Sequence, residues 1–191
     1  NANLYYMDWE DQQASFGPPL DTTVINAGES RLYGVEFDLR WLAGNAWTFF
    51  LAGAYNNTEF TDFDLVDPLL NGNEFPISPE YQFSTGAIAQ FDSGWFLSVD
   101  ASYTDDFFSD TENSPSPANP TIDNRNDDYT VVNAKFGYQA DRWSANLFVR
   151  NAFDEFYTLR VNRGDPDIPN TVGQATVGAP RVVGLEFMVD Y

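Results

Sequence analysis

The sequence contains no cysteine and no histidine. Without cysteine there can be no disulfide, thiol nucleophile or thiolate metal site, and without histidine there is no imidazole ligand and no catalytic triad with a histidine base. An enzyme hypothesis would have to rely on carboxylates, and no pair of them has a spacing that defines an active site. The sequence therefore predicts no enzyme, no cofactor and no metal centre.

Basic residues are also scarce. There are 9 Lys and Arg residues against 29 Asp and Glu residues, which gives a formal net charge of -20. A chain of this sign repels the phosphates of nucleic acids and anionic membrane surfaces, which argues against nucleic acid as a partner.

Long apolar runs are missing as well. No run approaches the roughly 20 residues of a membrane-spanning helix, and no apolar signal segment with positive charge opens the chain. The chain begins at Asn1 in what reads as the middle of a strand, so we expect it to be part of a longer protein. Aromatic residues make up 17% of the chain and accompany Asn, Asp, Gly and Thr, a composition that favours β-structure.

Apolar and polar residues alternate clearly at the C-terminal end, over residues 179–191, A-P-R-V-V-G-L-E-F-M-V-D-Y. Successive strand side chains point to opposite faces. One face would carry Val183, Leu185, Phe187, Val189 and Tyr191, and the other Gly184, Glu186, Met188 and Asp190. A strand with one apolar and one mixed face suits a barrel wall between lipid and a polar interior.

Comparable segments of about ten residues, the length of a tilted membrane strand, recur along the chain. We predict strands at 3–12, 31–41, 47–55, 82–91, 95–103, 129–138 and 143–151, besides the last. Short turns near residues 42, 93 and 140 alternate with long polar loops at 13–28, 58–79, 105–128 and 154–178. This pattern predicts an all-β fold, an antiparallel transmembrane β-barrel segment of about eight strands with short periplasmic turns and long extracellular loops.

Aromatic residues gather near the predicted strand ends. Trp41, Trp47, Phe91, Trp95, Trp143 and Tyr191 lie beside the short turns or the terminus, and Trp9, Tyr55, Phe83, Tyr103 and Tyr129 beside the long loops. Two such bands are typical of rings at the two membrane interfaces. The competing interpretation is a soluble β-sandwich whose strands happen to be aromatic.

Three stretches carry a family resemblance: N-A-G-E-S-R-L-Y-G-V-E-F-D-L-R-W at 26–41, L-F-V-R-N-A-F-D-E-F-Y at 147–157 and G-A-P-R-V-V-G-L-E-F-M-V-D-Y at 178–191. In this order they resemble the C-terminal part of the barrel of TonB-dependent outer-membrane receptors. The resemblance covers residues 1–191 as the last eight strands of a larger barrel in the Gram-negative outer membrane. The final residue is Tyr191, where the family usually has Phe.

The resemblance implies a gated transporter for a scarce nutrient such as a ferric siderophore, a cobalamin-like compound or an oligosaccharide. It also implies several partners: outer-membrane lipid, an N-terminal plug domain that is absent from this sequence, the TonB energy-coupling complex acting through that plug, and the barrel assembly machinery, for which Tyr191 would be the signal. The alternative is a complete small eight-stranded outer-membrane barrel with an adhesion or structural role.

Candidate site residues form two sets. The lumen-lining set would contact the plug or substrate, or simply make the lumen polar, and comprises Glu36, Asp38, Arg40, Asp100, Lys135, Arg150 and Glu186. The ligand-facing loop set, whose rings could stack on a sugar or chelate, comprises Phe107, Phe108, Asp110, Asp127, Asp128, Tyr157 and Arg160.

The loops also carry many carboxylates, which are the oxygen ligands that Ca²⁺ takes. They are Asp105, Asp106, Asp110, Glu112, Asp123, Asp127, Asp128, Asp165 and Asp167. However, D-N-R-N-D-D at 123–128 lacks the glycine and the closing glutamate of a defined Ca²⁺ loop. We therefore predict solvated loop charge at these positions.

Overall fold

The computed structural model describes residues 1–16, 23–64, 67–113, 124–162 and 173–190, and almost all of its regular structure is β-strand. Eight strands form one antiparallel sheet in the order β1-β2-β3-β4-β5-β8-β9-β12. Their bounds are β1 Ala2–Phe16, β2 Thr23–Ala43, β3 Trp47–Asp62, β4 Tyr81–Gln90, β5 Trp95–Thr104, β8 Tyr129–Gln139, β9 Trp143–Arg150 and β12 Val182–Val189. Two small two-stranded sheets accompany it, β6 Phe107–Phe108 with β7 Arg125–Asn126, and β10 Thr158–Asn162 with β11 Gln174–Val177.

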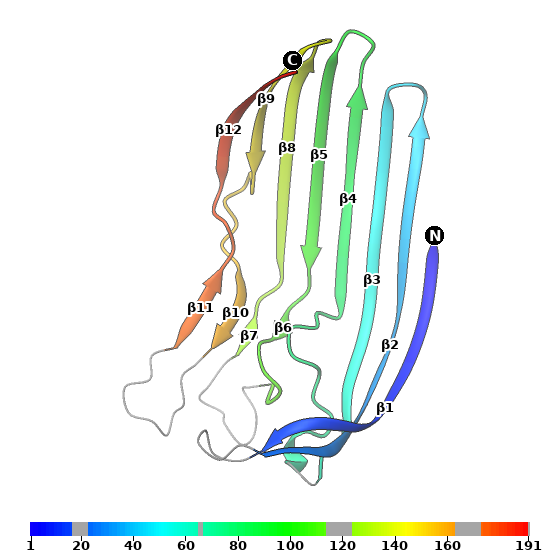
Figure 1. Ribbon diagram of the computed structural model, residues 1–191, viewed down its shortest axis with the longest axis vertical. Coiled ribbons are helices and arrows are strands. Elements are labelled where there is room, and N and C mark those ends of the chain that lie inside the picture. The colour runs from blue at the N-terminus through cyan, green and yellow to red at the C-terminus, as the bar shows by residue number, and fades with distance from the viewer. Residues whose placement is uncertain (17–22, 65–66, 114–123, 163–172, 191) are drawn as a thin grey trace.

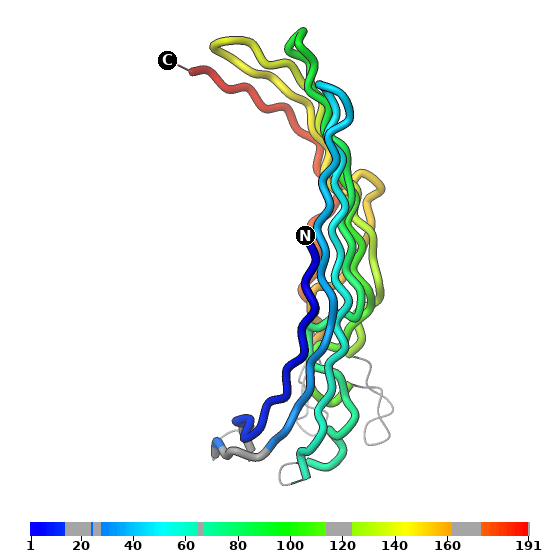
Figure 2. Tube along the Cα trace, turned by 90° about the vertical axis from the view of Figure 1, so that its right-hand side faces the viewer, coloured from blue at the N-terminus to red at the C-terminus, as the bar shows by residue number. Residues whose placement is uncertain are grey.

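The large sheet is tall and curved (Figures 1 and 2). The short turns lie at one end, here called the turn end, and the long connections at the other, the loop end. Figure 2 shows the sheet bowed to one side, which gives it a concave and a convex face. Within the described residues β1 pairs only with β2 and β12 only with β9, so these two strands are the edges of the sheet.

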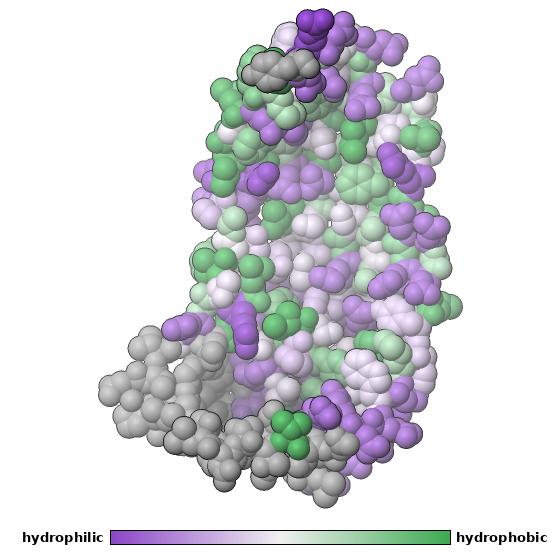
Figure 3. Space-filling model, viewed as in Figure 1, coloured by the Kyte–Doolittle hydropathy of each residue, from purple (hydrophilic) through white to green (hydrophobic). Residues whose placement is uncertain are grey.

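The strand register keeps each face continuous, because directly opposed residues of an antiparallel pair point to the same side. Leu147 in β9 lies opposite Leu185 in β12 on the convex face, and Asp100 in β5 lies opposite Asn133 in β8 on the concave face. The convex face is thus largely apolar from the turn end to Tyr33, beyond which Asp8, Arg31 and Glu59 lie on it, and the concave face is mixed. Figure 3 looks onto the concave face, where hydrophilic residues are interspersed with hydrophobic ones.

Aromatic rings form two bands on the convex face, as predicted. The turn-end band contains Trp41, Trp47, Phe49, Phe91, Trp95, Phe136, Tyr138, Trp143 and Phe187. The loop-end band contains Tyr33, Tyr55, Tyr81, Phe83 and Tyr103. Two predicted members were assigned wrongly: Trp9 lies opposite Ser30 and Tyr129 opposite Thr104, both on the concave face, because a position near a strand end does not fix the face.

The three N-terminal strands are longer than predicted. β1, β2 and β3 have 15, 21 and 16 residues, whereas β4 and β5 have 10 each. Parts of the predicted loops 13–28 and 58–79 are therefore strand. Pairing of β1 with β2 continues past a register shift between Trp9 and Gln12, next to Asp11 with its positive φ of 55°, and so extends the sheet at the loop end.

The last strand is shorter than predicted and starts at Val182, after Pro180, which has no N–H to give to a sheet. Buried apolar side chains are few in the described residues, as a single-layer sheet requires, and Phe60, Phe63 and Phe107 among them lie at the loop end. No helix in the described residues is long and apolar enough to cross a membrane.

Candidate functional site

All members of the predicted lumen-lining set lie on the concave face. Glu36, Asp38 and Arg40 follow each other at every second position of β2, opposite Ala54, Ala52 and Phe50 of β3. The other members lie across the far half of the sheet, with Asp100 on β5, Lys135 on β8, Arg150 on β9 and Glu186 on β12.

Four strands bring the charges of that far half together. The Lys135 Nζ lies 3.1 Å from Glu186 Oε2, to which the Asn146 amide also donates at 3.0 Å, and the Asn133 amide donates to Asp100 Oδ2 at 2.7 Å. The Lys135–Glu186 pair is about 40% exposed, so its contribution to stability is at most about 1 kcal/mol. Asp100, Asn133, Lys135, Arg150 and Glu186 line a hollow of about 390 Å³, which gives the concave wall a polar recess with both signs of charge.

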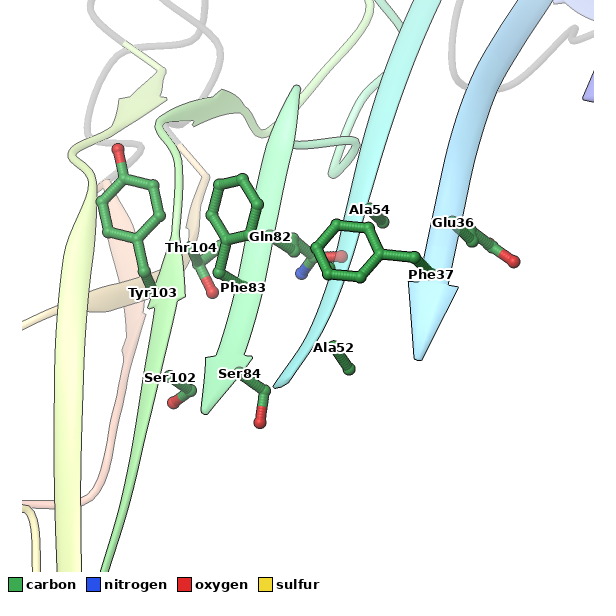
Figure 4. Close-up of a pocket in the computed structure, with 11 residues that line it drawn as sticks. Glu36, Phe37, Ala52, Ala54, Gln82, Phe83, Ser84, Ser102, Tyr103 and Thr104 are labelled. Carbon is green, nitrogen blue, oxygen red and sulfur yellow. The ribbon is translucent and has the colours of Figure 1, made fainter. Parts of the chain in front are cut away.

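A second hollow of about 390 Å³ lies around Gly53, where β2 to β5 meet (Figure 4). A Cβ at Gly53 would lie 2.7 Å from the Phe83 ring and 2.8 Å from the Phe37 ring, so glycine lets both rings close over β3. On the concave face most of the lining residues are small, Ala52, Ala54, Ser84 and Ser102, and Gln82 and Thr104 complete the lining beside Glu36.

At the loop end an aromatic cluster covers the concave face of β1 to β3. Trp9 stacks on Phe75 with centroids 5.9 Å apart, and Phe60 contacts Phe75 at 4.9 Å and Phe63 at 4.8 Å. The backbone N–H of Phe75 donates to Thr58 Oγ1 at 3.0 Å. The described part of the predicted loop 58–79 therefore packs against the sheet, where Phe63 and Phe75 contact rings of β1 and β3.

This loop is tied to the next one. The Ile77 N–H donates to the Phe108 carbonyl at 2.7 Å, and the Asn73 amide donates to the Thr111 carbonyl at 2.8 Å. Glu74 lies between these two contacts, and desolvation raises the pKa of its carboxyl, with Glu80 and Asp106 raising it further. Neither Asn73 nor Glu74 was predicted as a site residue, because only folding brings the two loops together.

Asn126 links the predicted loop 105–128, in which it lies, to the predicted loop 154–178. Its amide donates to Ser109 Oγ at 2.7 Å and its Oδ1 accepts from Thr158 Oγ1 at 2.8 Å, while the Val161 N–H donates to Ser109 Oγ at 2.8 Å. The described parts of the three long connections thus form one hydrogen-bonded body, which we call the loop cluster.

The predicted ligand-facing residues occupy different places in this cluster. Phe107 is 4% exposed, so its ring is buried inside the cluster, and Tyr157 stacks on Tyr129 with centroids 4.3 Å apart. Phe108 is half-buried, whereas the other members are exposed: Asp110, Asp127, Asp128 and Arg160. Asp110 accepts from the N–H of Glu112 at 3.0 Å.

Among the described residues no group of three or more acidic side chains is arranged to hold a metal ion. Asp123, Asp165 and Asp167, which belong to the predicted acidic loop set, lie outside the described residues.

The family model of the TonB-dependent receptor-like β-barrel matches residues 1–152. The chain belongs to the TonB-dependent receptor family. Receptor barrels of this family lie in the Gram-negative outer membrane, so the predicted family, fold and location are confirmed.

Individual receptors are also similar to this chain in sequence and in structure. The pesticin receptor of Yersinia pestis is 24% identical over 194 residues, which span all of this chain and 26% of that receptor. The ferric yersiniabactin uptake receptor FyuA from Yersinia pestis superposes with a TM-score of 0.79 at 21% identity, covering all of this chain and 27% of that one. The siderophore receptor PiuA from Acinetobacter baumannii gives a TM-score of 0.76 at 19% identity, covering 98% and 25%. The chain thus spans about a quarter of the length of these relatives.

Two of the receptor motifs found in the sequence are connected by hydrogen bonds in this barrel. In N-x-x-D-x-x-Y, Asn151 is 3% exposed; its side chain bonds the N–H of Glu155 at 2.8 Å and the carbonyls of Glu155 and Ala179 at 2.8 and 3.0 Å. Asp154 accepts from the Arg181 N–H at 2.8 Å. The second and third motifs are therefore joined to each other, which sequence spacing alone does not show.

Proposed function

We propose that this chain supplies part of the wall and ligand-facing loops of an outer-membrane receptor that takes up a ferric siderophore. The observation that carries the proposal is a polar concave wall beneath a hydrogen-bonded loop cluster in a barrel of the TonB-dependent receptor family. The names of two structural relatives, a ferric yersiniabactin uptake receptor and a siderophore receptor, support an iron chelate over the cobalamin-like and oligosaccharide alternatives.

Transport needs parts that lie elsewhere in a longer protein. In the proposal, a plug domain fills the concave side and contacts the lumen-lining charges, with Glu36 and Arg40 on β2 and Lys135 and Arg150 on the far strands. The TonB complex acts on this plug to release ligand inward.

A complete small barrel is not favoured as the function of this chain. Such a barrel would pair its first and last strands, whereas β1 and β12 are opposite edges of the described sheet. The curated relatives are receptors about four times as long as the chain.

The test is uptake by cells that carry the full-length gene. We expect ⁵⁵Fe supplied as a ferric siderophore to accumulate in the cells, and this accumulation to disappear when TonB is inactivated. Labelled cobalamin and maltooligosaccharide should not accumulate through the receptor. A panel of catecholate, hydroxamate and mixed phenolate chelates would identify the ligand. TonB-dependent uptake of cobalamin or sugar alone would overturn the iron proposal and leave the family assignment intact.

Matched variants locate ligand contacts within the loop cluster. Replacing exposed Arg160 by Gln or Asp128 by Asn should change the half-saturating chelate concentration, whereas Asp92→Asn, exposed in a turn-end connection, should leave it unchanged. Equal effects at both ends of the sheet would show that the loop cluster is not the ligand surface.

A further inference from the structure

The loop-end aromatic band on the convex face stops before it reaches the last strands. Its rings follow one another across β2 to β5, from Tyr33 to Tyr55 at 6.5 Å, then to Tyr81 at 5.2 Å, Phe83 at 6.3 Å and Tyr103 at 6.4 Å. Opposite Tyr103, the next strand, β8, has Thr130. The ring series therefore ends at β8 on the sheet itself.

The chain leaves the sheet beside this position. β9 ends at Arg150, and the Ala152 N–H donates to the Val132 carbonyl at 2.8 Å. Val132 and Thr130 are consecutive positions of β8 on the convex face. The chain returns at Tyr157, whose ring stacks on Tyr129. Residues 152–156, which we call the bulge, thus stand at the height of the aromatic band. In Figure 2 this golden segment protrudes from the convex side of the sheet.

The bulge presents two rings outward. The exposed fractions of Phe153 and Phe156 are 76% and 77%, among the highest of the large apolar side chains in the described residues. Apolar surface of this kind is unfavourable in water and marks an interaction site when it is held in place.

The bulge is held in place by its base. The Asn151 side chain bonds Glu155 and Ala179, and the Asn151 N–H donates to Asn133 Oδ1 at 3.1 Å. Asp154 accepts from the Arg181 N–H, and both Asn151 and Asp154 have positive φ, 49° and 59°. These hydrogen bonds fix the backbone of the bulge in a conformation that leaves Phe153 and Phe156 exposed.

We propose that the bulge is a membrane-interface anchor, with Phe153 and Phe156 inserted at the apolar boundary of the outer leaflet. Lipid is the occupant that the position selects, because the bulge continues both the apolar convex face and its aromatic band, and aromatic rings prefer this depth. It extends beyond the end of β9 the band that the strands supply on β2 to β5.

Depth measurement tests the proposal in the full-length protein reconstituted in phosphatidylcholine vesicles. This chain has no cysteine, so only cysteines elsewhere need replacing. Phe153→Cys and Phe156→Cys carry a nitroxide, and its collision rates with oxygen, which concentrates in lipid, and with a nickel chelate, which stays in water, are compared. Leu147→Cys on the convex face is the lipid reference and Asp127→Cys in the loop cluster is the water reference.

We expect the oxygen-to-nickel ratios at 153 and 156 to approach that at 147 and to exceed that at 127. A ratio like that at 127 overturns the anchor, since the rings would lie in water. Exclusion of both reagents also overturns it and indicates a protein partner on the bulge. Each variant must first show the heat-dependent gel shift of a folded barrel, and either label alone decides the question if the other variant fails to fold. None of these outcomes depends on whether the receptor transports iron.

Discussion

Single polar side chains hold the irregular parts of this barrel, and Asn151 is the clearest example. Its side chain makes the three hydrogen bonds described above, and its φ of 49° is one that asparagine tolerates better than most residues. One residue therefore closes the bulge and attaches it to the segment before β12.

Replacing Asn151 by Ala should destabilise the barrel by about 2–4 kcal/mol, because each lost hydrogen bond is worth about 1 kcal/mol and alanine is strained at this φ. Asn151→Gly relieves the strain but not the lost bonds, and should fall between Ala and wild type. Urea unfolding in micelles, followed by tryptophan fluorescence, measures both. Equal stability of all three proteins would show that the bonds contribute nothing net.

We expect Glu74 to make the stability of the loop cluster depend on pH. Desolvation and the neighbouring carboxylates raise its folded-state pKa above the ordinary 4.5. A raised pKa means that protonation favours the folded cluster; the stabilisation is complete below the ordinary pKa and is lost as pH rises through the folded-state value.

Glu74→Gln should therefore slow hydrogen exchange of residues 72–78 at pH 7, and the difference from wild type should vanish as pH falls below about 4. Glu112→Gln, an exposed acid of the neighbouring loop, is the control and should change little. A Glu74→Gln effect that is the same at both pH values would rule out titration as its cause.

At the scale of elements, alternation with a period of two is what the sequence encodes most strongly. This alternation predicted the strands, the short turns and the two faces. The register is strongly specified, because a shift of one residue would turn Leu147 or Leu185 from the convex to the concave face. The alternation did not reveal the extension of β1 to β3 at the loop end. The composition of residues 23–30 favoured a loop. They are strand because they pair with β1 and, at their C-terminal end, with β3.

Strand packing also depends on a close approach at Gly34 in β2. A Cβ there would lie 2.1 Å from the Tyr55 carbonyl oxygen and 2.5 Å from the Tyr5 hydroxyl, which hydrogen-bonds Asn56. Gly34→Ala should therefore push β1 to β3 apart and reduce the folded fraction in the outer membrane, measured by the heat-dependent gel shift. Ala52→Ser, which adds one oxygen beside an open hollow, should assemble normally. Normal assembly of both would show that the strands separate at little cost.

At the scale of the whole molecule, assembly of the barrel is predicted to depend on its terminal residue. Tyr191 lies outside the described residues, and its role as an assembly signal stays a prediction. Tyr191→Asp should leave the full-length receptor out of the outer membrane because a charge replaces the aromatic end of the last strand. Tyr191→Phe, which restores the usual family residue, should insert fully. Membrane fractionation separates the two, and insertion of the Asp variant would contradict the prediction.

The net charge of -20 also acts on the whole molecule, but its distribution is set by the fold. Charged residues of β2, such as Glu36 and Arg40, face the concave side, whereas Asp127 and Asp128 lie exposed at the loop end. Composition gave the excess of acid; register and loop folding decided that the convex wall between the two aromatic bands stays apolar.

The sequence by itself determined the all-β class, the wall with two unlike faces, the alternation of turns and loops, and the family. These follow from local features, side-chain alternation and short motifs, which need no knowledge of distant contacts. Tertiary structure alone decided that Trp9 and Tyr129 face inward, that three loops form one cluster through Asn73 and Asn126, and that Phe153 and Phe156 protrude from a bulge. Each of these rests on pairing between residues far apart in the chain, whose partners only the folded sheet selects.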